Sequence, residues 1–455
     1  MRAANQPFPS LAGPWRSVSG SPLIGEVLAP GDKSISHRAL IFAGLADGES
    51  TIRGLLEGDD VLRTAAVLRA LGVEVERDVS NGTANWRVHG GVWRTPDQAL
   101  YFGNSGTGCR LMMGAIAGRE IAARFDGDAS LRARPMGRIL DPLIMMGANA
   151  ASEENKLPAD FSGGALNGIE YTLPVASAQI KSAILLASLG ATGTTSIIEP
   201  TPSRDHTERM LAAFGVPLSI EENPNGGRKI ISQGGQNLTP ANINVPGDPS
   251  SAAFPVIAAL ITPGAHIVVR NVLMNPLRSG VFTTLKEMGA DLSIENERMA
   301  NGEPIADICA RHSPLKGVAV PASRAPSMID EYPILAVAAA FASGDTYMPG
   351  IEELRVKETD RIDATTALLQ AAGVETDAGP DWLRVVGCSG NVRGGAPDAA
   401  PVKTRHDHRI AMSALVLGLG ADNPMTIDDA SMIATSFPNF FTQMGSLGAQ
   451  LTPVS

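Results

Sequence analysis

Cysteine is scarce in this sequence. Only three cysteines occur in 455 residues, Cys109, Cys309 and Cys388. So small and odd a number excludes a disulfide framework and indicates a reducing compartment. No apolar run reaches the ~18 residues of a membrane helix, and the first 20 residues lack the continuous apolar stretch of a secretory signal. We therefore expect a cytoplasmic protein that does not enter a membrane.

Aromatic and charged residues are also few, at 4% and 18% of the chain. The cores must therefore be packed mainly from Ala, Leu, Ile, Val and Met. Hydrophobic residues make up 44%, which excludes a disordered chain. The formal net charge of -10 argues against non-specific binding to nucleic acid. The net charge of the protein does not decide the sign of the charge on a small substrate, because cations can cluster locally.

Glycine and proline are abundant, with 48 and 32 residues, and a short pattern containing glycine recurs along the chain. An amphipathic stretch ends in an apolar residue and Gly, and a short alternating segment follows. These glycines recur at intervals of about 75 residues. They are Gly72, Gly147, Gly215, Gly289, Gly373 and Gly448. We therefore predict six copies of one α/β unit.

Each unit also contains a polar start to a helix rich in Ala, Leu and Ile. Two of these starts, Pro30–Ser34 and Pro246–Ser250, are close copies three units apart. The fold class predicted is therefore α/β, with two similar domains of three repeat units each, and an open solenoid is disfavoured because these helices are too uniformly apolar. We expect a flexible tail over residues 1–20. One domain spans 32–246, the other combines 21–31 with 247–455, and the active-site cleft lies between them.

Cations stand close to several of these helix starts. Helix N-termini carry about half a positive charge and bind anions, although each polar start can equally be a simple cap. The cations are Lys33, Arg38, Arg110, Arg132, Arg134, Arg138, Arg204, Arg355, Lys357, Arg361 and Arg409. Together they predict a site for a strongly anionic small substrate. Asp330 and Glu358 stand among them and can transfer protons, with an N-cap and a surface ion pair as their alternative roles.

Other patterns do not carry a function of their own. The glycine-rich segment 103–108 is neither a dinucleotide fingerprint nor a P-loop. His406 and His408 lack a third ligand nearby in the sequence, so we predict no metal site. Cys109 has no neighbouring His, and we expect a buried, unreactive thiol.

Seven ordered segments resemble one known family across nearly the whole chain. They are 30–38 (PGDKSISHR), 103–107 (GNSGT), 134–136 (RPM), 176–179 (ASAQ), 330–333 (DEYP), 355–361 (RVKETDR) and 407–412 (DHRIAM). The chain resembles the 3-phosphoshikimate 1-carboxyvinyltransferases, or EPSP synthases, of the enolpyruvyl transferase family. The resemblance implies transfer of the enolpyruvyl group of phosphoenolpyruvate to the 5-hydroxyl of shikimate 3-phosphate, through a tetrahedral intermediate and with release of phosphate. It places the protein in the shikimate pathway to aromatic amino acids.

The resemblance also implies roles for the matched residues. Asp330 is expected to accept the proton of the 5-hydroxyl, and Glu358 to protonate the methylene carbon and later remove a proton. Lys33 is expected between the two substrates. The shikimate 3-phosphate residues are Ser34 and Arg38 (carboxylate), Ser177, Ala178 and Arg204 (phosphate), and Asp330 and Lys357 (hydroxyls). The phosphoenolpyruvate residues are Gly106, Arg134, Gln179, Arg361 and Arg409. No metal and no cofactor is implied.

Three rival interpretations remain. A UDP-N-acetylglucosamine enolpyruvyl transferase usually has a reactive Cys in the loop before the Arg-Pro motif, and here 126–130 has none. An RNA 3′-phosphate cyclase needs a nucleotide-binding motif, and the sequence has none. A non-catalytic repeat scaffold does not explain why cations stand at the helix starts.

Gly106 lacks the methyl group that narrows the site of some family members, so we expect sensitivity to the inhibitor glyphosate. We expect a monomer that binds no nucleic acid.

Overall fold

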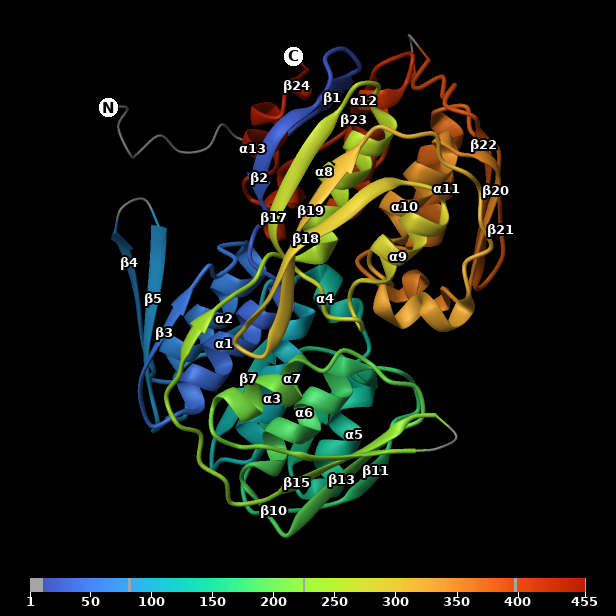
Figure 1. The fold of residues 1–455 in the computed structure, drawn as a ribbon. Coiled ribbons are helices and arrows are strands. Elements are labelled where there is room, and N and C mark those ends of the chain that lie inside the picture. Colours follow the sequence, from blue (N-terminus) through green and yellow to red (C-terminus); the bar gives the residue numbers. More distant parts are fainter. Residues whose placement is uncertain (1–10, 81–82, 224–225, 397–398, 455) are drawn as a thin grey trace. The chain divides into compact units, whose positions relative to one another are not determined.

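The computed structural model describes residues 11–80, 83–223, 226–396 and 399–454 (Figure 1). The chain forms two compact units. One comprises residues 31–246 with 299–304, and we call it the 31–246 unit. The other comprises the chain up to Pro30, residues 247–298 and residues 305–455, and we call it the 247–455 unit.

A layer of apolar helices forms the centre of each unit. Within the described residues, those of the 31–246 unit are α1 (Lys33–Leu45), α3 (Gly106–Ala117) and α6 (Ala178–Ser188). Those of the 247–455 unit are α8 (Pro249–Ile261), α10 (Tyr332–Phe341) and α12 (His408–Gly420). All but a few of their residues are buried, as helices that are apolar on every side require. In their units, α3 packs on α1 and α6, and α12 packs on α8 and α10.

A second set of helices is amphipathic and ends at the repeat glycines. They are α2 (Asp59–Ala70), α5 (Gly137–Met146), α7 (His206–Ala213), α9 (Gly280–Glu287), α11 (Arg361–Ala371) and α13 (Phe440–Ser446). All six glycines have φ between 77° and 118°. The residue after each glycine donates a backbone hydrogen bond to the carbonyl five residues earlier, as Val73 does to Leu68. The recurring glycine is therefore a left-handed helix cap, and a short strand follows it.

Gly289 offers a clean test of this cap. It has φ 84°, and a Cβ atom there would meet nothing closer than the Pro314 carbonyl at 3.9 Å. We expect Gly289→Ala to lower the free energy of unfolding by about 1–2 kcal/mol, from backbone strain alone. Gly445→Ala is the control, because its Cβ meets nothing within 4 Å and it lies inside α13. Chemical denaturation measures both, and an equal effect of the two variants would contradict the assignment.

Small sheets cover the helices of the 31–246 unit, and one strand order recurs in them. The first two strands are parallel and the remaining neighbours antiparallel. The first sheet is β16 (Asn242–Asn244), β3 (Gly48–Arg53), β5 (Thr83–Gly90) and β4 (Glu74–Ser80). The second is β6 (Leu100–Tyr101), β7 (Ala122–Asp126), β9 (Ala159–Ser162) and β8 (Asn149–Ser152). The third is β11 (Glu170–Thr172), β13 (Thr194–Glu199), β15 (Arg228–Gln233) and β14 (Ser219–Glu222).

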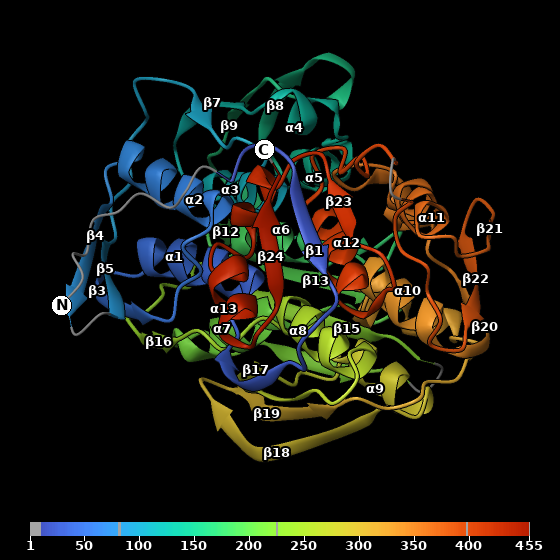
Figure 2. The same ribbon diagram turned by 90° about the horizontal axis from the view of Figure 1, so that it is seen from above.

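In the described part of the 247–455 unit, one four-stranded sheet begins with a parallel pair in the same way, and the two other sheets have three antiparallel strands each. Its first sheet has the order β2 (Ile24–Leu28), β17 (His266–Leu273), β19 (Glu303–Arg311) and β18 (Asp291–Ala300), and Figure 2 shows β19 between β17 and β18. The others are β20 (Ser343–Pro349), β22 (Trp382–Cys388) and β21 (Thr376–Ala378), and β23 (Met425–Ile427), β1 (Trp15–Val18) and β24 (Gln450–Pro453). The prediction of a six-unit α/β fold is confirmed.

The expected flexible tail over residues 1–20 is wrong for residues 15–18. These residues form β1, which pairs antiparallel with β23 and β24. Trp15 is 7% exposed and packs on Phe441, with 4.0 Å between the ring centroids. Residues 1–10 of the predicted tail lie outside the described residues.

The tip of the β18–β19 hairpin belongs to a different unit from the one that we expected. Residues 299–304 belong to the 31–246 unit, although we expected them in the other. Three contacts explain this: Glu303 bonds His206, the Gly302 carbonyl accepts from Arg209 at 2.6 Å, and the Asn301 side chain accepts from the Asn244 amide at 2.9 Å. No helix in the described part of the chain is long and apolar enough to span a membrane.

Candidate active site

Six of the predicted binding residues of the 31–246 unit lie at helix starts. Lys33 and Ser34 begin α1, Gly106 begins α3, and Ser177 caps α6 ahead of Ala178 and Gln179. The α1 cap is well formed, since the Asp32 carboxylate accepts from the Ile35 amide at 2.8 Å. Lys33 forms an ion pair with Asp60 of α2. The remaining N–H groups of these first turns favour anions.

Arg38 lies one turn further along α1 and is held rigidly. It is 2% exposed and donates to the Thr207 hydroxyl at 2.8 Å, the Ser182 hydroxyl at 2.7 Å and the Ser34 carbonyl at 2.9 Å. Burial lowers the pKa of Arg38 to about 10; the charge of Arg204 acts in the same direction, and Glu208 opposes it. Arg38 therefore stays charged at neutral pH, close enough to Arg204 for the two to interact.

A second group of polar side chains surrounds Gly106. Gln179 accepts from Arg110 at 2.9 Å and donates to the Thr107 hydroxyl at 2.9 Å. Arg134 follows α4 (Ala129–Ala133) and donates to the Asn104 side chain at 2.6 Å. A Cβ atom on Gly106 would lie 3.1 Å from a guanidinium nitrogen of Arg110 and of Arg134. Gly106, Arg134 and Gln179 thus lie in one group, linked through Arg110 and Thr107.

In the 247–455 unit, the predicted acids converge on one arginine. Arg361 begins α11 and is 1% exposed. It donates to Asp330 at 3.2 Å, to Glu358 at 2.6 Å and to Asp407 at 2.7 Å and 3.5 Å. Burial alone would lower the pKa of Arg361, but the three carboxylates outweigh it and raise the pKa. Asp330 and Glu358 therefore share one fixed cation.

Lys357 and Arg409 lie next to this cluster. The Lys357 ammonium lies 3.8 Å from Asp330 and 2.6 Å from Glu353. Arg409 is in the first turn of α12 and is 9% exposed, and its backbone amide donates to Asp407 at 2.8 Å. Among the described residues, no hydrogen-bond partner reaches the buried Nε of Arg409. An anion is a suitable partner for that atom.

Some residues that shape the site carried no role in the sequence analysis. Asp407 orients Arg361, Asn104 orients Arg134, and Thr207 and Ser182 orient Arg38. Asp407 and Asn104 stand inside two of the segments that carry the family resemblance, 407–412 and 103–107, so their position was the available signal. Nothing in the sequence around Thr207 or Ser182 indicates which arginine they bind, because the contacts span more than 140 residues.

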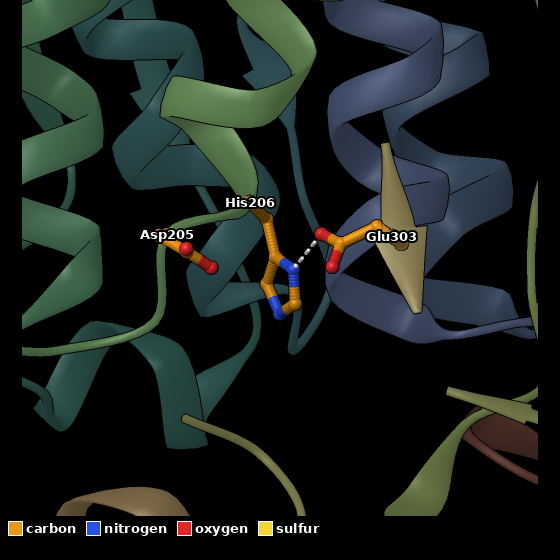
Figure 3. Close-up of side chains that lie close together, drawn as sticks. All are labelled: Asp205, His206 and Glu303. Carbon is orange, nitrogen blue, oxygen red and sulfur yellow. Dashed lines mark hydrogen bonds and ion pairs between the residues drawn. The ribbon is translucent and has the colours of Figure 1, made fainter. Parts of the chain in front are cut away.

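Asp205, His206 and Glu303 also lie close together in the 31–246 unit (Figure 3). His206 Nδ1 and Glu303 Oε1 are 2.8 Å apart. Arg209 lies 2.9 Å from Asp205 and 3.5 Å from Glu303, so a guanidinium already compensates both carboxylates. A divalent cation would have to displace Arg209, and we interpret the group as an ion-pair cluster rather than a metal site.

Cys109 is fully buried inside α3, as expected for a structural thiol. Burial raises the pKa of the Cys109 thiol to about 12, with Arg110 opposing the shift. At neutral pH the thiol stays protonated, and a protonated thiol is a poor nucleophile.

Repeated α/β units that present cations at helix starts, together with fixed carboxylates, define an enzyme for small anionic substrates. Comparison with known proteins identifies the family. The family model for EPSP synthase (3-phosphoshikimate 1-carboxyvinyltransferase) matches residues 18–444. The chain therefore belongs to the EPSP synthase family, whose members are transferases.

Individual similar proteins match nearly the whole chain. A 3-phosphoshikimate 1-carboxyvinyltransferase of Parvibaculum lavamentivorans is 57% identical over 94% of both chains, and one of Caulobacter vibrioides is 54% identical over 97% of this chain and 99% of that protein. The EPSP synthase structure from Acinetobacter baumannii matches with a TM-score of 0.82 and 43% identity, covering 97% of this chain and all of that one. The enolpyruvyl transferase NikO of Streptomyces tendae, at 20% identity and a TM-score of 0.74, shares the fold.

Proposed function

We propose that this enzyme transfers the enolpyruvyl group of phosphoenolpyruvate to the 5-hydroxyl of shikimate 3-phosphate, in the shikimate pathway to aromatic amino acids. The observation that carries the proposal is the cluster at Arg361. Two carboxylates, Asp330 and Glu358, are fixed on one buried guanidinium beside Lys357. Such an arrangement can move two protons near a multiply anionic substrate without a metal.

The chemistry needs an acid and a base in sequence. Glu358 protonates the methylene carbon of phosphoenolpyruvate, which makes the neighbouring carbon electrophilic. The 5-oxygen of shikimate 3-phosphate attacks that carbon while Asp330 accepts the hydroxyl proton, and a tetrahedral adduct forms. Glu358, now a carboxylate, removes a proton from the new methyl group as phosphate leaves. Nearby cations stabilise the phosphate charge throughout.

In this proposal, three groups of residues bind shikimate 3-phosphate. Ser34 and Arg38 bind its carboxylate, and Ser177, the Ala178 amide and Arg204 bind its phosphate. Asp330 and Lys357 contact its hydroxyls. The helix starts and the buried charge of Arg38 support this assignment.

Phosphoenolpyruvate is bound by Gly106, Arg134, Gln179, Arg361 and Arg409, with Lys33 between the two substrates. Four of the five N–H groups of Arg361 bond carboxylates in the described part of the chain. Arg361 therefore offers phosphoenolpyruvate one N–H group, and Arg134 and Arg409 supply the remaining charge. We further propose that the enzyme acts as a monomer in the cytoplasm, which light scattering and cell fractionation test.

Gly106 supports a prediction about glyphosate, the inhibitor that mimics phosphoenolpyruvate. We expect competitive inhibition against phosphoenolpyruvate in roughly the micromolar range, and Gly106→Ala should raise the inhibition constant by about tenfold or more. The added methyl group would lie 3.1 Å from Arg134 and force it to move. Gly164→Ala is the control, because its Cβ meets nothing within 4 Å. Unchanged inhibition of Gly106→Ala would remove Gly106 from the inhibitor site.

The direct test of the proposed acceptor is phosphate release from phosphoenolpyruvate. We expect release with shikimate 3-phosphate and none with UDP-N-acetylglucosamine. Family membership and the absence of a cysteine from residues 126–130 both disfavour the sugar nucleotide. Release with the sugar nucleotide alone would overturn the proposal.

A further inference from the structure

Four ionic side chains lie buried together behind the loop that carries Arg204. They are Lys181 of α6, Glu199 at the end of β13, Glu208 of α7 and Arg228 at the start of β15. The exposed fractions of the four side chains are 0%, 0%, 4% and 8%. Each cation contacts both carboxylates, at distances from 2.7 to 3.2 Å. We call them the buried quartet.

A contribution to stability does not by itself explain why these four charged side chains are buried together. Removing charges from water is costly, and replacing a buried ion pair by apolar side chains of similar volume is often neutral or stabilising. Two cations and two anions compensate one another here, so the quartet does not attract a further ion by net charge. Its geometry needs another reason.

The hydrogen bonds that leave the quartet converge on Ser203, the residue before Arg204. Glu199 accepts from the Ser203 amide at 2.9 Å and from the Ser203 hydroxyl. Lys181 and Arg228 donate to the Ser203 carbonyl at 3.2 Å and 3.0 Å. All polar groups of one residue in a loop are thus bound to buried charges.

These bonds fix the direction in which Arg204 leaves the loop. The carbonyl of Ser203 and the amide of Arg204 share one planar peptide unit, so two cations hold the plane to which Arg204 is attached. Lys181 also follows Ser177 by one turn of α6, and therefore joins the α6 start to the same loop. On the other side of Arg204, Glu303 holds His206 at the start of α7 (Figure 3).

We infer that the buried quartet positions the residues that bind the 3-phosphate. Through its bonds to Ser203 it holds Arg204 in the orientation that binds this phosphate, and Lys181 links the same loop to the start of α6. The inference rests on the proposed role of Arg204. Its four members are positioning residues, since none of them contacts the substrate in this account.

The test compares binding of shikimate 3-phosphate with binding of shikimate, which lacks the phosphate, by calorimetry. Glu199→Gln keeps the shape but removes a charge. We expect it to weaken shikimate 3-phosphate binding about tenfold, as loss of a well-aimed charged hydrogen bond does, and to leave shikimate binding unchanged. Glu170→Gln in the same sheet is the matched control, because it removes an exposed ion pair with Lys229. Equal weakening of both ligands, or of neither, would overturn the inference.

Two further variants keep the outcome decisive. Ser203→Ala deletes one hydroxyl and leaves the quartet in place, so it replaces Glu199→Gln if that variant does not fold. We expect it to weaken binding of shikimate 3-phosphate about threefold and to leave binding of shikimate unchanged.

Arg204→Ala distinguishes failure of the proposed role of Arg204 from failure of the positioning role of the quartet. If it leaves shikimate 3-phosphate binding intact, the proposed role of Arg204 fails. If it weakens binding and the Glu199 and Ser203 variants do not, only the positioning role fails. In the double variant, Glu199→Gln should add little to Arg204→Ala.

Discussion

Glu358→Gln should lower kcat by ~10²–10⁴-fold and change the dissociation constants of both substrates far less. The amide keeps the size of the side chain and can still accept from Arg361, which lies 2.6 Å from the carboxylate. It can neither protonate the methylene carbon nor remove a proton from the adduct. Steady-state kinetics and calorimetric titration of each substrate separate the two effects.

Glu352→Gln is the matched control for this variant. Glu352 begins the 3-10 helix (Glu352–Val356) that ends two residues before Glu358, and its side chain is exposed. We expect its kcat to stay within about twofold of the parent, as for surface substitutions in general. If Glu358→Gln weakened binding as much as it slowed turnover, Glu358 would have a structural role and the proton-transfer scheme would be wrong.

Arg361→Ala should lower the free energy of unfolding by about 3–5 kcal/mol and abolish turnover. The variant leaves three carboxylates without their shared cation, and Asp407 among them is 0% exposed. Breaking a buried ion pair by removing one partner typically costs that amount, because the remaining charge is uncompensated. Chemical denaturation followed by circular dichroism measures the loss.

Two companion variants assign the loss to that charge. Arg361→Ala combined with Asp407→Asn should be more stable than Arg361→Ala alone, because Asn removes the charge and remains a good N-cap for α12. Arg384→Ala removes exposed ion pairs with Asp345 and Asp377 and should cost about 1 kcal/mol or less. Equal losses for Arg361→Ala and Arg384→Ala would contradict the role of Arg361 as the buried centre of the cluster.

Local rules made much of the fold predictable from the sequence. A glycine such as Gly147, with φ of 118°, ends a helix because glycine adopts the left-handed cap conformation without a steric penalty. The six capping glycines therefore revealed the repeat in the sequence. Asp32, Ser177, Asp248 and Asp407 mark helix starts for an equally local reason, since each accepts from an amide two or three residues later.

Features that depend on distant residues were not predictable. Residues 15–18 lack a local signal that separates a tail from a strand, because their partners lie about 410 residues further on in β23 and more distant still in β24. The tip of the β18–β19 hairpin joins the other unit through side chains such as Glu303 and His206. Nor does the sequence around Lys181 show that its ammonium contacts Glu199 and Glu208, which come from two other elements.

The candidate site was likewise predictable where it depends on local sequence and not where it depends on distant residues. The sequence indicated which cations and acids belong together, because they occur in recognisable segments. It did not show that Asp330, Glu358 and Asp407 share Arg361, since a hydrogen-bonded cluster depends on how α10, α11 and α12 pack. In the proposed mechanism, Arg361 therefore has a second role, because it holds Asp330 and Glu358 as well as binding phosphoenolpyruvate.

In the proposed reaction, phosphoenolpyruvate gives its enolpyruvyl group to the 5-oxygen of shikimate 3-phosphate by addition and elimination. Nuclear magnetic resonance of a reaction run in D₂O tests it directly. We expect one enol ether on the 5-oxygen for each phosphate released, with solvent deuterium in its methylene group, because Glu358 adds one proton and removes another. Phosphate release without an enol ether, or an enol ether without deuterium, would contradict it.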